Sequence, residues 1–384
     1  MKQGWEIKKL GEVCEIVGGS TPKTKEPTYW NGEYYWATPA DLNGSKYISS
    51  TMRTITDAGI KSAHLQLLPI GTVLLSSRAP IGKVAITTVP MYCNQGFKNL
   101  ICGNTLNNGY AYWFLSYNTD YLNSIGTGAT FKEISKTVVE QIPITIPPLS
   151  EQERIVAELD LLSDVIAKKR EQLKQLDTLA QSIFYDMFGD PITNEKGWET
   201  KKLGEISTSQ IGITYKPEDV SDNGMGTVVL RSGNIQNSSL CFNDIIKVNK
   251  DIREDKYVKD GDILMCSRNG SFQLVGKVAM ITTLKERMTY GAFMTVIRSD
   301  YQPFLFAFFK SPAFRSQLTT AKTATINQIT IRMLENMQVI LPPLTLQQEF
   351  ASKIESIEKQ NELIKQSLSE VQQLFDSRMD YYFG

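Results

Sequence analysis

Trp5-Glu-Ile-Lys-Lys-Leu-Gly-Glu12 recurs as Trp198-Glu-Thr-Lys-Lys-Leu-Gly-Glu205, and this repeated stretch decides how the rest of the chain is organised. Three more matches follow in the same order in both halves: Gly82-Lys-Val-Ala85 with Gly276-Lys-Val-Ala279, Pro147-Pro-Leu149 with Pro342-Pro-Leu344, and Phe188-Gly189 with Phe383-Gly384. The matched stretches lie 193 to 195 positions apart, whereas solenoid repeats run to about 50 residues. The sequence therefore predicts a tandem duplication of one domain and one tail.

Each copy is predicted to hold a globular domain and a helical tail, with boundaries at 1–146, 147–192, 193–341 and 342–384. The globular parts mix short β-branched runs with Gly, Pro, Asn and Asp turns, which is typical of short strands. A Pro-Pro pair ends each globular part, because proline cannot continue the preceding element. The expected fold class is α+β.

The two tails carry apolar residues at every seventh position, with a companion series beside them. Four to five such heptads are typical of a coiled coil. Two copies on one chain favour pairing of the two helices with each other in an antiparallel sense, and a helix of 40 residues is about 60 Å long. Lys169 and Asn361 interrupt the two series; they either are tolerated near an exposed edge or fix the register of the pair. The spacer and partner-binding candidates are Gln152, Leu159, Ile166, Lys169, Leu173, Gln347, Ile357, Asn361, Ile364 and Leu368.

Composition and charge narrow the class of protein. The 384 residues are 41% hydrophobic and 10% aromatic, which favours a folded protein with two or more domains. The formal net charge is zero, yet the two globular parts carry +3 and +4 while the two tails carry −4 and −3. Mildly basic domains are compatible with phosphate contact. The zero total therefore does not exclude a nucleic-acid ligand.

Location is predicted from the cysteines and from the apolar runs. Five cysteines without a C-x-x-C pair are typical of structural thiols in a reduced, cytoplasmic setting. No apolar run approaches the roughly 20 residues that span a bilayer, and the start of the chain lacks an apolar signal segment. No membrane partner is expected.

Several catalytic and cofactor motifs are missing from the sequence. It contains no G-x-x-x-x-G-K-[ST] loop, no G-x-S-x-G elbow, and no acid or amide before its Pro-Pro pairs of the kind that amino-methyltransferases use. The single histidine, His64, does not supply a histidine-based metal site. We therefore expect no catalytic, cofactor or metal site in this chain, and a recognition module whose chemistry belongs to a partner.

These features together resemble the specificity subunit of type I restriction–modification enzymes. The resemblance rests on two domains that each open with the repeated Trp-Glu stretch and close with Pro-Pro-Leu and a long helix, and it covers essentially the whole chain. Segments similar to target-recognition domains are Thr21-Pro22-Lys23, Tyr29-Trp30-Asn31-Gly32, Trp36-Ala37-Thr38-Pro39 with Asp41-Leu42, and Asn94-Gln95-Gly96-Phe97. In the second copy Tyr290-Gly-Ala-Phe293 stands where Asn94-Gln-Gly-Phe97 is expected.

The resemblance implies a non-catalytic subunit in which each domain reads one half of an asymmetric, bipartite sequence in double-stranded DNA. It implies that the helical spacer sets the gap between the halves and docks two modification (methyltransferase) subunits, which bind S-adenosylmethionine. Two restriction (motor–nuclease) subunits, which use ATP and Mg, can join the complex.

DNA-contact candidates follow from comparing the two copies. Residues that recur are better candidates for phosphates, and residues that differ are better candidates for bases. Arg78 and Arg268 either end a shared strand or reach guanine. The second copy carries four extra residues between Arg268 and Gly276, and loops on a rigid scaffold are where recognition varies. The DNA-binding candidates are Thr21, Lys23, Lys25, Tyr29, Arg78, Asn94, Gln95, Lys98, Lys132, Lys216, Arg231, Asn234, Arg268, Asn269, Gln273, Lys322 and Asn327.

Three other interpretations remain open from the sequence. One is a stand-alone, pseudo-dimeric DNA-binding protein, and another is a coiled-coil scaffold without DNA readout. A nuclease is the third, and it would need a carboxylate–metal cluster that the sequence does not display.

Overall fold

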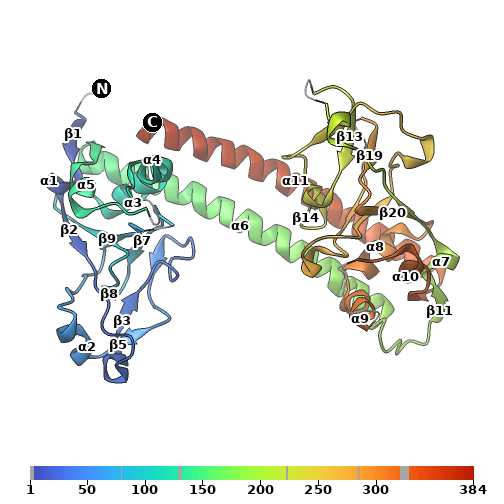
Figure 1. Cartoon of the computed structure of the whole chain (residues 1–384), viewed down its shortest axis with the longest axis horizontal. Helices are drawn as coiled ribbons and strands as arrows, with labels where there is room; N and C mark the ends of the chain where they lie inside the picture. The colour runs from blue at the N-terminus through green and yellow to red at the C-terminus, as the bar shows by residue number, and fades with distance from the viewer. Residues whose placement is uncertain are drawn as a thin grey trace. The chain divides into compact units, whose positions relative to one another are not determined.

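The computed structural model describes residues 4–78, 80–128, 132–221, 224–282, 284, 286–320 and 328–384. It divides into two compact units, and each combines a globular domain with parts of two long helices. Unit 1 holds residues 1–170 and 366–384, and unit 2 holds residues 171–365. Figure 1 traces both units along the chain.

The globular domain of unit 1 is built from short strands and short helices. Its strands are β1 (Glu6–Lys9), β2 (Cys14–Gly18), β3 (Trp30–Ala37), β4 (Tyr47–Ile48), β5 (Thr54–Ile55), β6 (Val73–Leu75), β7 (Val84–Thr87), β8 (Tyr92–Cys93), β9 (Lys98–Cys102) and β10 (Pro143–Ile146). Its helices are α1 (Leu10–Val13), η1 (Pro27–Tyr29), α2 (Asp57–Ser62), α3 (Asn108–Tyr117), α4 (Thr119–Ile125) and α5 (Lys136–Gln141).

Two sheets form the body of this domain. A five-stranded sheet runs in the order β2-β9-β6-β7-β4, and a three-stranded sheet runs β5-β3-β8. Every residue of β6 and β7 is buried, because α3 lies against both strands. These strands are rich in Val, Ile and Leu, as expected for strands covered on both faces. The apolar run Tyr110 to Ser116 forms most of α3.

The globular domain of unit 2 repeats this order. Its strands are β11 (Glu199–Lys202), β12 (Thr208–Ile211), β13 (Thr227–Leu230), β14 (Ile235–Gln236), β15 (Ser239–Leu240), β16 (Ile246–Val248), β17 (Ile263–Cys266), β18 (Val278–Met280), β19 (Met288–Tyr290), β20 (Met294–Arg298) and β21 (Gln338–Leu341). Its helices are α7 (Leu203–Ile206), η2 (Pro217–Asp219), η3 (Ser232–Asn234), η4 (Glu254–Lys256), η5 (Phe272–Leu274), α8 (Gln302–Lys310), α9 (Pro312–Thr320) and α10 (Ile331–Glu335).

The sheets of the two domains share seven corresponding strands, and unit 1 adds β4 at the end of its larger sheet. The order β12-β20-β17-β18 corresponds to β2-β9-β6-β7, and β16-β13-β19 corresponds to β5-β3-β8. In both three-stranded sheets the central strand pairs antiparallel with one neighbour and parallel with the other. The duplication predicted from the sequence is therefore also a duplication of topology.

The first and last strands of each domain lie side by side. In unit 1, β1 pairs antiparallel with β10, and in unit 2, β11 pairs antiparallel with β21. The repeated Trp-Glu-x-Lys-Lys stretch supplies β1 and β11, so its recurrence has a structural reason. Each ladder brings the start of a domain to the Pro-Pro pair from which a long helix begins.

Helices α6 (Leu149–Phe188) and α11 (Leu344–Phe383) are each 40 residues long. In unit 1 the start of α6 contacts the end of α11, where Arg154 bonds the Tyr382 hydroxyl at 3.2 Å and Glu158 pairs with Arg378 at 2.8 Å. Further along α6, Arg170 bonds the Gln372 side chain at 3.2 Å. Residues later in α6 thus contact residues earlier in α11. The two helices therefore run antiparallel, as predicted.

In unit 2 the end of α6 packs against the start of α11 through aromatic rings. Phe184 lies with its ring centroid 5.9 Å from that of Phe350 and 5.6 Å from that of Phe304 in α8. Phe188 completes the cluster, with its centroid 5.1 Å from Phe350. Helix α8 thereby joins the globular domain to both long helices of its unit.

Candidate nucleic-acid interface

Unit 1 carries a cluster of charged side chains just beyond the end of β6. Arg78 Nε donates to Glu133 Oε2 at 2.9 Å, and Lys98 Nζ donates to Glu133 Oε1 at 3.2 Å. Lys98 also donates to the Ser77 hydroxyl at 3.4 Å. Partial burial opposes the charge on Glu133, but the hydrogen bonds from Arg78 and Lys98 outweigh it and lower the pKa of this carboxyl. The predicted candidates Arg78 and Lys98 are thus brought together.

The polar loop after β2 lies next to this cluster. The Thr21 hydroxyl donates to the Gln95 side-chain oxygen. The Gly96 carbonyl, one residue on, accepts from the Ser77 amide at 2.7 Å, and Asn94 Oδ1 accepts from the Gly96 amide at 2.9 Å. Four predicted candidates, Thr21, Asn94, Gln95 and Arg78, therefore share one edge of unit 1.

Of the remaining first-copy candidates, three lie between β2 and β3, and the fourth, Lys132, directly precedes Glu133. Lys23 and Lys25 are exposed, and the Lys23 carbonyl accepts from the Trp30 indole at 3.2 Å. Tyr29 is half-buried, and Lys132 is exposed. These lysines offer cationic side chains to solvent, which suits phosphate contact.

One cation of this domain was missed by the sequence reasoning. The Arg53 guanidinium lies 3.6 Å from the ring centroid of Trp30 and 5.4 Å from that of Trp36, and Arg53 is exposed. The two indoles pack edge to face at 4.9 Å. Arg53 lies at least 17 positions from either tryptophan in the sequence. No short-range sequence pattern therefore predicts this cation–π contact.

Unit 2 repeats the backbone of the strand-end cluster. The Ser267 amide donates to the Phe293 carbonyl at 2.9 Å, and the Ile329 amide donates to the Ser267 carbonyl at 2.7 Å. Arg268 forms an antiparallel bridge with Gln328, as Arg78 does with Glu133. The carboxylate of the first copy is therefore an amide in the second.

The ladder registers also correct one predicted correspondence. Gly18 pairs with Lys98, and Ile211, which is the counterpart of Gly18, pairs with Thr295. Lys98 therefore corresponds to Thr295, and the segment 291–294 corresponds to 94–97. The sequence alignment of Tyr290–Phe293 with Asn94–Phe97 is wrong by one residue, because the phenylalanines were matched by type and not by register.

The four extra residues after Arg268 form a turn held by its own domain. They include the short helix η5, and Arg315 donates to the carbonyls of Val275 at 2.5 Å and Gln273 at 3.5 Å. The Gln273 side chain is exposed, and Asn269 Nδ2 donates to the Ser232 hydroxyl at 3.3 Å. Asn269 and Gln273 thus lie in the same loop as Arg268.

Another candidate, Asn234, has a structural position. It is 2% exposed, and its amide donates to the carbonyls of Cys241 at 2.9 Å and Asp244 at 3.0 Å. Its Oδ1 accepts from the Arg231 amide at 2.8 Å. These bonds fix the turn after β13, so we withdraw Asn234 as a base contact.

The other second-copy candidates have mixed surroundings. Arg231 pairs with Asp244 at 2.8 Å, and exposed Lys216 pairs with Glu218 at 3.3 Å. Lys322 and Asn327 lie outside the described residues.

The two glutamines near the helix starts, predicted to bind partners, are instead buried within their own units. Gln152 Nε2 donates to the carbonyls of Pro147 at 2.8 Å and Thr105 at 2.9 Å, and its Oε1 accepts from the Asn107 amide at 2.8 Å. Among the described residues, Gln347 repeats only the first bond, to Pro342 at 2.7 Å. Both side chains tie a helix to the preceding Pro-Pro pair.

Replacing these glutamines by alanine is expected to destabilise the two units unequally. Gln152→Ala removes the partner of three backbone groups, one buried and two part-buried, at about 1 kcal/mol each, so we expect a loss of about 2–3 kcal/mol. Gln347→Ala is the matched control, with an expected loss of about 1 kcal/mol, because the Gln347 Oε1 has no hydrogen-bond partner among the described residues. Hydrogen exchange of β10 and β21 amides measures both, and equal losses would contradict this account.

The heptad residues divide by burial. Leu159, Ile166 and Ile357 are buried, which fits a seam between paired helices. Half-buried positions are Lys169, Leu173, Asn361, Ile364 and Leu368. The Asn361 Oδ1 is buried without a hydrogen-bond partner in the described part of the chain. A polar group that costs stability in a seam is the kind that specifies register.

Two aspartates of α6 anchor the globular domains, and neither was predicted. Lys46 pairs with Asp160, which also accepts from the Trp113 indole at 2.8 Å. In unit 2, Lys310 of α8 pairs with Asp177. Each pair spans more than 100 positions, so the sequence gives no local signal for it.

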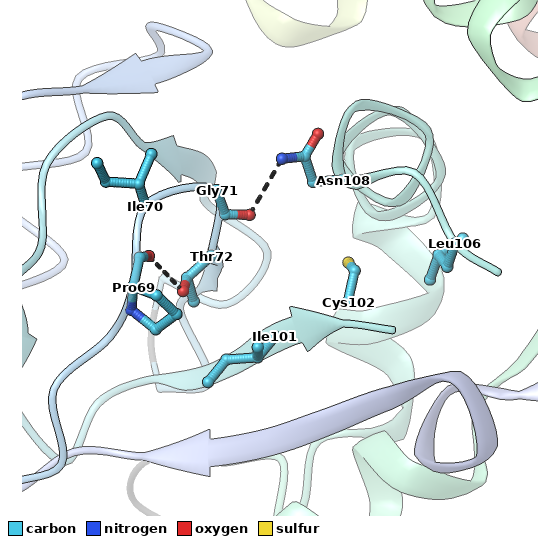
Figure 2. Close-up of a pocket in the computed structure, with 8 residues that line it drawn as sticks. All are labelled: Pro69, Ile70, Gly71, Thr72, Ile101, Cys102, Leu106 and Asn108. Atoms are coloured by element: carbon cyan, nitrogen blue, oxygen red, sulfur yellow. Dashed lines mark hydrogen bonds between the residues drawn. The ribbon is translucent and has the colours of Figure 1, made fainter. Parts of the chain in front are cut away.

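A small pocket of about 290 Å³ opens between β6, β9 and α3 in unit 1 (Figure 2). Its lining is Pro69, Ile70, Gly71, Thr72, Ile101, Cys102, Leu106 and Asn108. The Thr72 hydroxyl and the Asn108 amide already bond backbone carbonyls at 2.7 and 3.3 Å. The lining holds no carboxylate or histidine, so it offers no acid–base pair.

Among the residues that the structure describes, no three His, Cys, Asp or Glu side chains gather in a way that suits a metal ion. Over the same residues, no helix is both long and apolar enough to cross a bilayer. The five cysteines are free thiols.

Comparison with known proteins places the chain in a family. The family model for the type I restriction modification DNA specificity domain matches twice, at residues 2–177 and 195–373. A specificity subunit of the type I restriction enzyme MjaIX from Methanocaldococcus jannaschii is 30% identical, over 92% of this chain and 86% of that protein. The EcoKI specificity subunit of Escherichia coli is 23% identical, over 93% of this chain and 82% of that protein.

Solved structures agree on the fold. The type I restriction–modification S subunit from M. genitalium superposes with a TM-score of 0.59 at 14% identity, covering 99% of this chain and 96% of that one. A chain from a study of complex assembly in a type I restriction–modification system gives 0.57 at 18% identity, covering 100% and 98%. The chain described here belongs to the type I restriction–modification DNA specificity family.

Proposed function

We propose that this chain is the DNA sequence-specificity subunit of a type I restriction–modification complex and carries no catalytic site of its own. Each globular domain reads one half of a bipartite, asymmetric target. The observation that supports this function most is that both domains have the same backbone fold but different side chains at the strand-end edge. Lys98 and Glu133 of the first copy stand where Thr295 and Gln328 stand in the second. Two frames with unlike side chains at this edge read unlike half-sites.

The proposed contact residues are taken from the candidates that the sequence predicts, without Asn234. In the first domain they are Thr21, Lys23, Lys25, Tyr29, Asn94, Gln95 and Lys132, whereas Arg78 and Lys98 at the same edge are paired with Glu133. The second domain contributes Lys216, Arg231, Arg268, Asn269, Gln273, Lys322 and Asn327. Side chains that differ between the copies supply base contacts, and exposed lysines supply phosphate contacts.

The complex supplies the chemistry. Two modification subunits that bind S-adenosylmethionine dock on the paired helices and the adjoining domain framework, and two restriction subunits that use ATP and Mg can join. Acidic tails, with net charges of −4 and −3, suit protein surfaces better than phosphates. The proposed boundaries are 1–146, 147–192, 193–341 and 342–384, and the proposed location is the cytoplasm.

Co-expression with a cognate modification subunit tests the function. We expect genome-wide mapping of methylated bases to return a two-part sequence with a fixed gap. A complex that forms but methylates no recurring sequence would sink the proposal in favour of a scaffold without DNA readout.

The helices are proposed to set the length of the gap. Four residues inserted into both helices, after Arg170 in α6 and after Lys365 in α11, add about 6 Å at 1.5 Å per residue. Because base pairs are stacked about 3.4 Å apart, we expect the methylated sequence to show a gap longer by about two base pairs. The two half-sites should keep their bases.

The same four residues added after Gly384 are the control, because they lengthen neither paired segment. The control should leave the gap unchanged. If the doubled insertion altered the half-site bases instead of the gap, the helices would not act as a ruler.

A further inference from the structure

The two copies differ in charge at two structurally equivalent positions. Arg78 forms an antiparallel bridge with Glu133, and Arg268 forms the corresponding bridge with Gln328. Ser77 and Ser267, the residues before the arginines, accept from the Ile134 and Ile329 amides at 2.9 and 2.7 Å. The backbone therefore presents both arginines in the same way, and only the neighbouring side chains differ.

In the first copy a single carboxylate holds two cations. One Glu133 oxygen accepts a hydrogen bond from Arg78 Nε at 2.9 Å, and the other accepts one from Lys98 Nζ at 3.2 Å. The Lys98 side chain is 14% exposed and the Arg78 side chain 44% exposed. Charge-assisted hydrogen bonds of this kind are stronger than neutral ones. A phosphate or a guanine that approaches Arg78 must therefore compete with Glu133 and is repelled by its charge.

In the second copy the equivalent groups are neutral. Gln328 replaces Glu133, and Thr295, which replaces Lys98, is 1% exposed and accepts from the Ser267 hydroxyl. Arg268 is exposed, with its guanidinium 5.3 Å from the ring centroid of Phe293. Within the described residues no carboxylate pairs with Arg268. Each edge keeps a net charge of +1, but only the second offers an arginine unopposed.

We propose that Glu133 sets the recognition mode of the first domain by withholding Arg78 and Lys98 from the duplex, whereas Arg268 is the arginine that contacts DNA in the second domain. This inference rests on the proposed function. Glu133 acts here as a positioning residue. The acceptor for Arg268 is an oxygen or nitrogen of the duplex, on a guanine edge or on a phosphate, and the two are separated by the test below.

The first experiment compares Arg78→Ala with Arg268→Ala in the full chain bound to a modification subunit. The probes are a duplex with the sequence found by methylation mapping and an unrelated duplex of equal length. We expect Arg268→Ala to weaken binding to the mapped duplex about 5- to 150-fold, as for one arginine contact. Arg78→Ala, the matched control, should change it less than about threefold. A larger effect of Arg78→Ala would overturn the inference.

The unrelated duplex and single-base variants identify the acceptor of Arg268. If Arg268 contacts a guanine edge, Arg268→Ala relaxes discrimination at one base pair and leaves unrelated DNA nearly unaffected. If Arg268 contacts a phosphate, Arg268→Ala weakens both duplexes alike and reduces the salt slope by about 1. Either result supports an unopposed Arg268.

The second experiment transfers the charge between copies. Glu133→Gln should tighten binding to unrelated DNA and steepen its salt dependence by about one phosphate contact. In the Glu133→Gln background, Arg78→Ala should then cost several-fold, although it costs little in the wild type. Gln328→Glu should weaken binding toward the level of Arg268→Ala. A merely structural Glu133 would change thermal stability without these changes in salt dependence.

A further variant guards against loss of folding. Lys98→Thr combined with Glu133→Gln reproduces the neutral pair of the second copy and removes the unpaired lysine. If both this variant and Glu133→Gln leave DNA affinity and salt dependence unchanged, Glu133 does not withhold the cations. A wild-type complex that neither binds nor methylates a bipartite sequence would instead contradict the proposed function itself.

Discussion

A chain whose residues 213–337 come from another member of the family is expected to keep one half of its DNA target and acquire a new other half. The cut points follow from the ladders. Residue 213 lies just after β12, and residue 337 lies just before β21, so the host keeps the β11–β21 pair that leads into α11. Methylation mapping should show one altered half-site.

The reciprocal exchange of residues 20–142 is the matched control, because these positions lie 193 and 195 places earlier and leave β1 with β10. It should alter only the other half-site. Both outcomes are interpretable only if the exchanged chains fold. Methylation of any recurring sequence shows that an exchanged chain is folded. A graft that changed both halves together would exclude independent reading by the two domains.

Phe184→Ala is expected to lower the free energy of unfolding of unit 2 by about 3–5 kcal/mol. Phe184 is 1% exposed and lies at the centre of rings from α6, α8 and α11, with centroids 5.2 Å from Phe188 and 5.6 Å from Phe304. Truncation removes buried area and leaves a cavity between elements that close only partly around it. Hydrogen exchange of the β17 and β20 amides measures the loss.

Leu179→Ala on the same helix is the control. Leu179 is 46% exposed, so we expect a change within about 0.5 kcal/mol. Comparable losses from the two substitutions would mean that the ring cluster contributes no more to stability than an exposed side chain of the same helix.

The sequence predicted the duplication, the helical tails and their antiparallel pairing. These features depend on repeated stretches and heptad periodicity, which can be read directly from the sequence. Leu159 and Ile166 are buried where the heptad placed them. Partners far apart in the chain were not predictable. Asp160 meets Lys46 across 114 positions, and no period links them.

The candidate site shows the same limit. Arg78 was identified as a recurring strand-end residue, but its pairing with Glu133 spans 55 positions, and this pairing changes what the arginine offers to DNA. Asn234 was misjudged for a related reason. An amide in a polar loop satisfies neighbouring carbonyls as readily as a base, and only the fold shows that the carbonyls of Cys241 and Asp244 already occupy it.

Unit 1 draws its residues from both ends of the chain, and this has a consequence for biosynthesis. The 195 residues of unit 2 stand between Arg170 and Gln366. At about 5–20 residues per second, a ribosome needs roughly 10–40 s to translate them. Until then Leu159 lacks Met379 and Tyr382, with which it shares a core. During this time the nascent unit 1 exposes the apolar residues that α11 later covers. Slow translation or a lack of chaperones should therefore lower the yield of folded unit 1 more than that of unit 2.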